Sequence, residues 1–170
     1  MSSFSVLRRS ASATAVMIAL GVASGFVWLL LANPAEWEVR STGIVLTEAA
    51  AKGQFSVIVT FVLVGAGVSL AWGSVSGWLL RDLGWLITPL VVVVTLAAAV
   101  IAWRVGVGLG PPEPASVTGP SIGDKLPATL AVDGITPFLV WPIFGLLGVL
   151  LASWLGRKDD AGDVDKFVAS

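Results

Sequence analysis

The sequence predicts an all-α membrane protein with four transmembrane helices and a small extracytoplasmic β-cap formed by the two outer loops. Two observations indicate the membrane class: 56% of the 170 residues are hydrophobic while 12% are charged, and mean hydropathy is strongly positive. A soluble domain of this size needs a charged shell that the chain lacks. A third observation sets the number of helices, because charged residues divide the chain into four long uncharged segments.

The chain is predicted to form one membrane domain, residues 1–170, with spans at 11–33, 55–80, 84–105 and 136–156. Each span can cross a hydrocarbon core about 30 Å thick, which needs roughly 20 helical residues. The first follows Arg8 and Arg9 as a signal peptide would, but its apolar part exceeds the roughly 7–15 residues of such peptides. We therefore predict that it remains as a helix. The predicted outer loops are 34–54 and 106–135, and the polar tail is 157–170.

The distribution of Lys and Arg predicts the orientation, because these residues concentrate in cytoplasmic segments. One side holds six: Arg8, Arg9, Arg81, Arg157, Lys158 and Lys166. The other holds four: Arg40, Lys52, Arg104 and Lys125. The first side is therefore predicted to be cytoplasmic, which places both termini in the cytoplasm of a multi-pass plasma-membrane protein.

The outer loops carry local structural signals. Thr47 can cap a helix that begins at Glu48, where the helix dipole favours a carboxylate. Segments near 38–46 and 128–136 are β-prone, and Asp133-Gly134 is a hairpin signal. We expect the two segments to pair as the β-cap. The Gly/Pro/Ser-rich segment 106–125 is predicted to be neither helix nor strand; it is either a flexible connector, which the composition favours, or an arm lying on a partner.

Composition excludes several classes of site. The chain has no Cys, His or Tyr, which removes disulfides, iron–sulfur ligation and imidazole chemistry. A net charge of −1 gives no electrostatic basis for nucleic-acid binding. The four Asp residues of the tail lack the ligand pattern of a calcium-binding EF-hand. We predict no catalytic residue, no metal and no cofactor.

Small residues predict where helices approach each other. Gly21 and Gly25 form a GxxxG pair in the first span, and Gly73 and Gly77 form another in the second. Such pairs let helix backbones come close and pack by dispersion. Two interpretations remain open: packing within the four-helix bundle, which we favour, or packing on a partner subunit.

One charged residue at a span end is a candidate lipid contact. Arg104 follows Trp103 at the predicted outer end of the third span. Its guanidinium can extend to the headgroup region, as long basic side chains do near interfaces. The more specific interpretation is that Arg104 and Trp103 contact an anionic lipid headgroup or phosphate.

Three stretches resemble a family of small four-span actinobacterial membrane proteins of unknown function. They are WLLLANPAEWEV, GQFSVIVTFVLVGAGVSLAWG and DGITPFLVWPIFGLLGVLL, and the resemblance covers residues 15–155. The matching features are Trp28 leaving the first span, Glu48 with Phe55 entering the second, and Val140-Trp141-Pro142 entering the fourth. The resemblance implies four spans, an actinobacterial source and the plasma membrane. It implies no activity.

Three functions are consistent with these observations. The favoured one is a non-catalytic accessory or structural subunit of a larger actinobacterial plasma-membrane complex, with other membrane subunits and lipids as partners and a slight preference for the respiratory cytochrome supercomplex. The second is an enzyme or carrier in cell-envelope lipid or glycan assembly, which would need outer-face charges such as Glu48, Arg104 and Asp133 to converge. The third, an oligomeric channel or transporter, is disfavoured because no Asp, Glu or Lys lies within a span.

Overall fold

The computed structural model describes residues 3–32, 36–40, 43–46, 48–112, 125–127, 130–132 and 134–168. Four α-helices account for most of them: α1 Ser3–Leu31, α2 Glu48–Leu79, α3 Ile87–Leu109 and α4 Thr136–Val168. A 3-10 helix, η1 Arg81–Leu86, joins α2 to α3. Within the described residues, each α-helix contains or completes a segment long and apolar enough to cross a membrane: Ser5–Leu31, Gly53–Leu79, Arg81–Leu109 and Thr136–Gly156.

Helix boundaries differ from the sequence prediction in two places. α3 continues to Leu109, so the start of the Gly/Pro/Ser-rich segment 106–125 is helical rather than irregular. The reason is tertiary packing, because the indole of Trp28 lies against Gly106 and leaves no room for a side chain there. α4 also continues through most of the predicted tail, to Val168. The expected start of a helix at Glu48 agrees with α2, whereas the proposed cap Thr47 lies outside the described residues.

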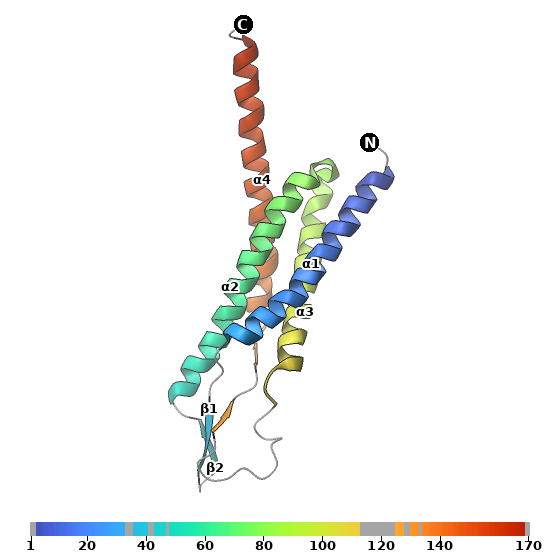
Figure 1. Cartoon of the computed structure of the whole chain (residues 1–170). Coiled ribbons are helices and arrows are strands. Elements are labelled where there is room, and N and C mark those ends of the chain that lie inside the picture. Colours follow the sequence, from blue (N-terminus) through green and yellow to red (C-terminus); the bar gives the residue numbers. More distant parts are fainter. Residues whose placement is uncertain are drawn as a thin grey trace.

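Three short strands follow the helices at one end: β1 Glu36–Arg40, β2 Gly43–Leu46 and β3 Lys125–Pro127. They form an antiparallel sheet in the order β2-β1-β3, with Trp37 opposite Leu46 and Glu38 opposite Lys125. Figure 1 shows them beyond the start of α2.

The predicted pairing of 38–46 with 128–136 is wrong. The first segment folds on itself as the β1–β2 hairpin, since two residues separate these strands and a short loop closes at lower entropic cost than a long one. The described residues 130–132 and 134–135 are not in a strand, and α4 begins at Thr136. Gly134, at φ 84°, leads into that helix instead of turning a hairpin, and Asp133 lies outside the described residues. The predicted strand at 128–136 is therefore not shown, and the second outer loop instead contributes β3, which pairs with β1.

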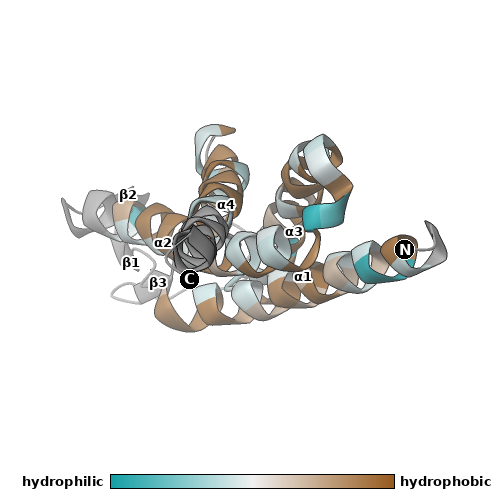
Figure 2. Ribbon diagram, turned by 90° about the horizontal axis from the view of Figure 1, so that it is seen from above, coloured by the Kyte–Doolittle hydropathy of each residue, from teal (hydrophilic) through white to brown (hydrophobic). Residues whose placement is uncertain are grey.

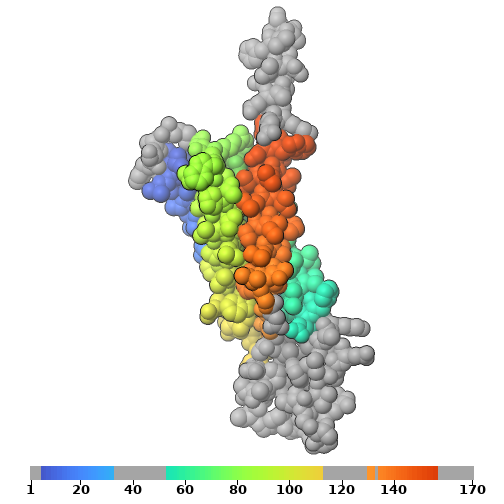
Figure 3. Space-filling model, turned by 180° about the vertical axis from the view of Figure 1, so that it is seen from behind, coloured from blue at the N-terminus to red at the C-terminus, as the bar shows by residue number. Residues whose placement is uncertain are grey.

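The helices that pack most closely are not consecutive in the chain. α2 packs along α4 and α1 along α3, whereas α2 and α3, which η1 joins, have little direct contact. Seen from above, α4 lies between α2 and α3, and α1 packs against α2 and α3 on the side away from α4 (Figure 2). From behind, α3 and α4 form one continuous surface (Figure 3).

The two ends of the bundle are named here by what they contain. The η1 end comprises the start of α1, the end of α2, η1 and the start of α3, and α4 runs out of the bundle there (Figure 1). The sheet end comprises the end of α1, the start of α2, the end of α3 and the start of α4, next to the strands (Figure 1). The described chain therefore begins and ends at the η1 end.

The α2–α4 contact is a crossing of two backbones. A Cβ atom on Gly73 would collide with the carbonyl oxygen of Gly145, and one on Gly148 would collide with the carbonyl oxygen of Leu70. Gly148 also faces the backbone nitrogen of Ser74, 2.6 Å from its would-be Cβ. Both helices therefore contribute glycine to the same crossing. The sequence prediction included Gly73 but missed Gly145 and Gly148.

The other predicted glycines also lie at contacts between helices of this chain. A Cβ on Gly21 would lie 2.8 Å from the carbonyl oxygen of Ala98, and one on Gly25 would lie 2.7 Å from that of Ala102. A Cβ on Gly77 would lie 3.0 Å from the Cβ of Ala152 on α4. The structure therefore places these glycines in packing within the bundle, which was the favoured interpretation.

Two tryptophans connect α1 to α2 by reciprocal hydrogen bonds. Trp28 donates its Nε1–H to the carbonyl oxygen of Val57 at 2.9 Å. Trp72 donates its Nε1–H to the carbonyl oxygen of Ala13 at 3.0 Å. Along each helix the donor and the acceptor are 15 residues apart, so the two bonds are separated by about 22 Å. They fix both the distance and the axial register between these helices.

An aromatic cluster fills the half of the bundle nearer the sheet end. Phe61 lies at its centre, with ring centroids 5.1 Å from Trp28, 5.4 Å from Phe138 and 5.7 Å from Trp141. Trp28 and Trp141 are fully buried, so these two side chains pack in the core rather than anchor the helices at the membrane interface. Trp141 lies directly over Gly65, as Trp28 lies over Gly106.

Two buried polar atoms lack a hydrogen-bond partner within the described part of the chain: Ser69 Oγ and Trp141 Nε1. Several hydroxyl groups in the helices bond to a carbonyl of the preceding turn, as Thr95 Oγ1 does to that of Val91 at 2.7 Å. An unpaired buried hydroxyl destabilises the folded state.

The backbone crossing predicts a large effect of added volume at Gly73. We expect Gly73→Leu to lower the free energy of unfolding by about 3 kcal/mol, because backbone atoms, which cannot move aside as a side chain would, occupy the space. The matched control is Gly67→Leu on the same helix, where a Cβ would meet nothing within 4 Å and the change should stay within about 0.5 kcal/mol. Thermal unfolding in mild detergent measures both; equal effects would contradict the crossing.

The unpaired hydroxyl of Ser69 predicts a stabilising substitution. We expect Ser69→Ala to raise the free energy of unfolding by about 1 kcal/mol, because it removes a buried polar group without a partner. Thr95→Val, which deletes a bonded hydroxyl at similar volume, should instead lower it by about 0.5 kcal/mol. The same unfolding assay compares them, and a clear loss of stability in Ser69→Ala would show that this hydroxyl has a partner in the membrane.

Candidate functional site

The charged side chains that the structure describes lie at the two ends of the bundle. They are Arg8, Arg9, Arg81, Asp82 and Arg104. No group of three or more potential metal-ligating residues occurs among the residues described. Candidate sites therefore lie at these two ends.

At the sheet end the predicted lipid-contact residues lie against each other. The Arg104 guanidinium is 5.1 Å from the centroid of the Trp103 ring, a cation–π geometry. Trp103 in turn meets Phe138 edge-on at 6.0 Å, which holds the indole against α4. Arg104 is exposed. Its contact with a lipid headgroup remains a prediction.

The outer-face charges considered for an enzyme are not brought together in the described part of the chain. Glu36, Glu38 and Arg40 lie on β1 and Glu48 begins α2, but their side chains are outside the description. Glu113, Asp124 and Asp133 are outside it altogether. The convergence of Arg104, Glu48 and Asp133 remains a prediction.

At the η1 end a tight turn positions two oppositely charged residues. The N–H of Leu83 donates to the carbonyl oxygen of Leu80 at 2.9 Å, and Gly84 adopts φ 56° and ψ −128°. This combination of angles is open to glycine and strained for other residues. The chain reverses direction at Gly84, and this turn fixes the positions of Arg81 and Asp82 directly after the end of α2.

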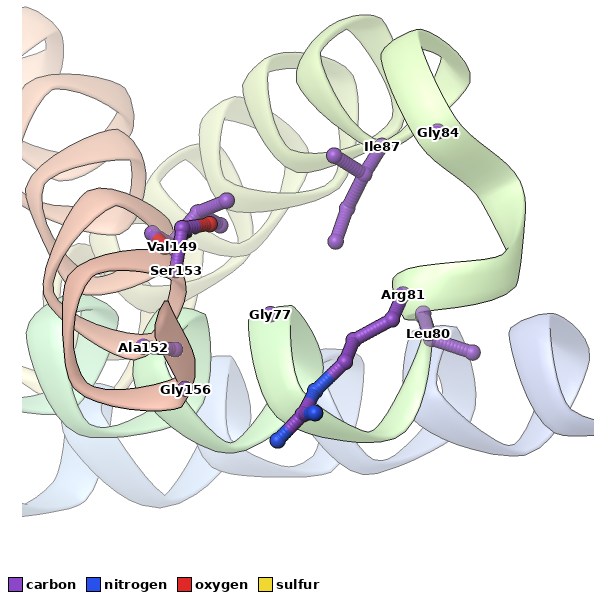
Figure 4. A pocket seen from close by; sticks show the side chains of 9 residues that line it. All are labelled: Gly77, Leu80, Arg81, Gly84, Ile87, Val149, Ala152, Ser153 and Gly156. Carbon is purple, nitrogen blue, oxygen red and sulfur yellow. Dashed lines mark hydrogen bonds between the residues drawn. The ribbon is translucent and has the colours of Figure 1, made fainter. Parts of the chain in front are cut away.

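Arg81 borders a cavity of about 360 Å³ enclosed by α2, η1, α3 and α4. Figure 4 shows its side chain extended toward Gly156 of α4, with Gly77 and Ala152 along the same space. A Cβ on Gly156 would lie 3.5 Å from Cζ of Arg81, an ordinary contact distance, so the guanidinium lies close to α4. The cavity is lined by Gly77, Leu80, Arg81, Gly84, Ile87, Val149, Ala152, Ser153 and Gly156.

A second hollow, of about 280 Å³, lies between Arg81 and Arg9. Asp82 and Trp78 also line it. Nη1 of Arg9 is 3.9 Å from Oδ2 of Asp82, and both side chains are about half exposed, so this ion pair contributes little stability. The Arg81 guanidinium lies 5.8 Å from the Trp78 ring. Among the described residues that line this hollow are two cations and one carboxylate, which leaves a net positive charge.

An apolar groove of about 400 Å³ starts at Arg9 and runs between α1 and α2. Trp72 crosses it, with its N–H already bonded to the carbonyl of Ala13. The groove is lined by Arg9, Ser12, Ala13, Val16, Trp72, Val75, Ser76, Leu79 and Leu80. Since Arg9 and Leu79 line both, the groove is continuous with the hollow between the two arginines.

Sequence reasoning did not predict this arrangement. It used Arg8, Arg9 and Arg81 only to predict the orientation in the membrane. The available signal was the presence of Arg9 and Arg81 at the same predicted membrane face, with Trp78 just inside the second span. The sequence could not indicate that α1 and α2 are neighbours, or that a groove lies between them at the η1 end.

No family model, curated protein or solved structure matches this chain. The family that the sequence resembles is therefore not shown by comparison. What is shown is a helical protein whose four apolar helices could span a membrane, consistent with a small multi-pass membrane protein.

The glycine turn predicts a specific effect on the η1 end. We expect Gly84→Ala to lower the free energy of unfolding by about 1–3 kcal/mol, because Ala is strained at positive φ. The control is Gly108→Ala in α3, where a Cβ would meet open space and alanine favours the helix. Thermal unfolding in detergent checks the pair; a neutral Gly84→Ala would refute the assigned turn geometry.

Proposed function

We propose that this chain is a non-catalytic accessory or structural subunit of a larger plasma-membrane complex, with both termini and the η1 end in the cytoplasm. The orientation is supported by the excess of Lys and Arg on that side. The observation that carries the proposal is an asymmetry in the surface that the bundle leaves exposed.

The exposed surface of α1 carries a stripe of small residues beside larger exposed side chains such as Val16 and Phe26. Ala11, Ala15, Ala19 and Ala23 recur every four residues, and all four are exposed. Residues at this spacing lie along one face of a helix. α2 adds two more exposed small residues, Gly67 and Ala71.

The exposed faces of α3 and α4 are different, because they consist mainly of large side chains. Val93 is 65% exposed on α3, Leu150 is 63% exposed on α4 and Trp154 is 53% exposed near the η1 end. Large aliphatic side chains mix readily with lipid tails. We assign the α3–α4 surface to lipid.

A stripe of small residues suits a different neighbour. Between helices in a membrane, lipid tails are as apolar as leucine, so association depends on close packing, which small residues permit. Gly21, Gly25, Gly73 and Gly77 already serve this purpose inside the bundle. The alanine stripe of α1 offers the same kind of contact outward, and it fits a transmembrane helix of a partner protein.

The proposal predicts that bulk on α1 disrupts assembly. We expect Ala19→Leu to reduce the yield of co-purified partner at least fivefold after extraction of the tagged chain in mild detergent. Val93→Leu, which adds bulk to the lipid-assigned surface of α3, should leave the yield unchanged. Recovery of the chain alone as one discrete species, or equal yields from both variants, would refute the proposal.

The eluate also identifies the complex. We propose the respiratory cytochrome assembly as the first candidate, and haem absorption bands with cytochrome subunits in fixed stoichiometry would support it. Enzymes of cell-envelope lipid or glycan assembly in the eluate would instead favour the alternative, a partner in that pathway.

A further inference from the structure

We propose that the η1 end binds one anionic phospholipid, with its phosphate between Arg9 and Arg81 and one acyl chain in the groove between α1 and α2. The inference does not depend on a protein partner. It rests on the continuity of a positively charged hollow with an apolar groove at one end of the membrane spans.

The charge at the hollow matches a phosphate group. Arg9 and Arg81 both line it, and Asp82, the one carboxylate among the described residues of the lining, is 3.9 Å from Arg9. The Arg81 guanidinium lies 5.8 Å from the Trp78 ring, which also lines the hollow. Guanidinium groups bind phosphate oxygens through paired hydrogen bonds. A phosphate there would balance the excess positive charge.

The groove matches a hydrocarbon chain. Two of its polar side chains already have partners, since the Trp72 N–H bonds to the Ala13 carbonyl and Ser12 Oγ bonds to the carbonyls of Arg8 and Arg9 at 3.0 Å. The wall of the groove consists mainly of Val16, Val75, Leu79 and the Trp72 ring. From Arg9 to Val16 it follows α1 for about 10 Å, enough for the upper part of one acyl chain.

The depth in the membrane also fits. The apolar segment of α2 ends at Leu79 and that of α3 begins at Arg81, so the hollow lies at the level of lipid phosphates. Trp78 lies beside it and is 62% exposed, as expected of an indole at the headgroup region. A zwitterionic lipid also has a phosphate, but its attached cation would approach the same arginines and weaken binding.

The test is native mass spectrometry of the purified full chain in detergent, titrated with phosphatidylglycerol or phosphatidylcholine of equal chain length. We expect one phosphatidylglycerol per chain, held at least tenfold more tightly than phosphatidylcholine. Arg9→Gln with Arg81→Gln should weaken phosphatidylglycerol binding at least tenfold. Arg104→Gln, which removes an exposed arginine at the sheet end, should leave it unchanged.

The groove has its own matched pair. Val16→Trp, which fills it, should weaken binding of phosphatidylglycerol at least fivefold, whereas Val22→Trp, an exposed α1 position outside the lining, should not. Arg81→Lys keeps the charge and should retain most binding, which separates loss of charge from loss of folding. Circular dichroism confirms that each variant is folded.

Three outcomes would overturn the inference. One is equal affinity for the two lipids, and another is a larger loss from Arg104→Gln than from the double variant. The third is displacement of the lipid by millimolar inorganic phosphate with no effect of Val16→Trp, which would indicate a site for free phosphate. Failure of lipid binding leaves the co-purification result unaffected, so the two proposals fail separately.

Discussion

The architecture depends on the contact between the backbones of α2 and α4. Gly73 on one helix and Gly145 and Gly148 on the other leave no space for a side chain between them. Such a contact gains dispersion energy over many atoms and requires no hydrophobic driving force, which lipid does not supply between helices. Because it brings together two helices that are not consecutive in the chain, it also places α4 between α2 and α3 and leaves α1 to close the other side.

In the rest of the core, too, glycine on one helix makes space for a neighbouring helix, here for large side chains. Trp28 and Trp141, the largest fully buried side chains, each lie over a glycine of a neighbouring helix, Gly106 and Gly65. Trp28 also donates to the Val57 carbonyl, so one residue joins α1 to both α2 and α3. The aromatic cluster that results closes the half of the bundle near the sheet end, whereas at the η1 end α1 and α2 are joined by Trp72 and separate beyond it.

This difference between the ends gives the two proposals distinct locations. The outward alanine stripe lies along α1 and suits a helix, because a helix needs a long, smooth face. The hollow of Arg9 and Arg81 is short, charged and at headgroup depth, and it opens into an apolar groove, which suits an amphipathic lipid. A lipid held there would lie next to the surface proposed for a partner helix.

The sequence by itself determined the membrane class, the four spans, the start of α2 at Glu48 and the importance of Gly21, Gly25, Gly73 and Gly77, because hydropathy, charge and residue size act locally. The tertiary structure decided which segments contact each other. It pairs α2 with α4 through Gly145 and Gly148 and extends α3 past Gly106. It also forms the β1–β2 hairpin and brings Arg9 close to η1. These depend on which helices are neighbours. Neighbour choice is a property of complementary surfaces far apart in the chain, and no local pattern in one segment encodes it.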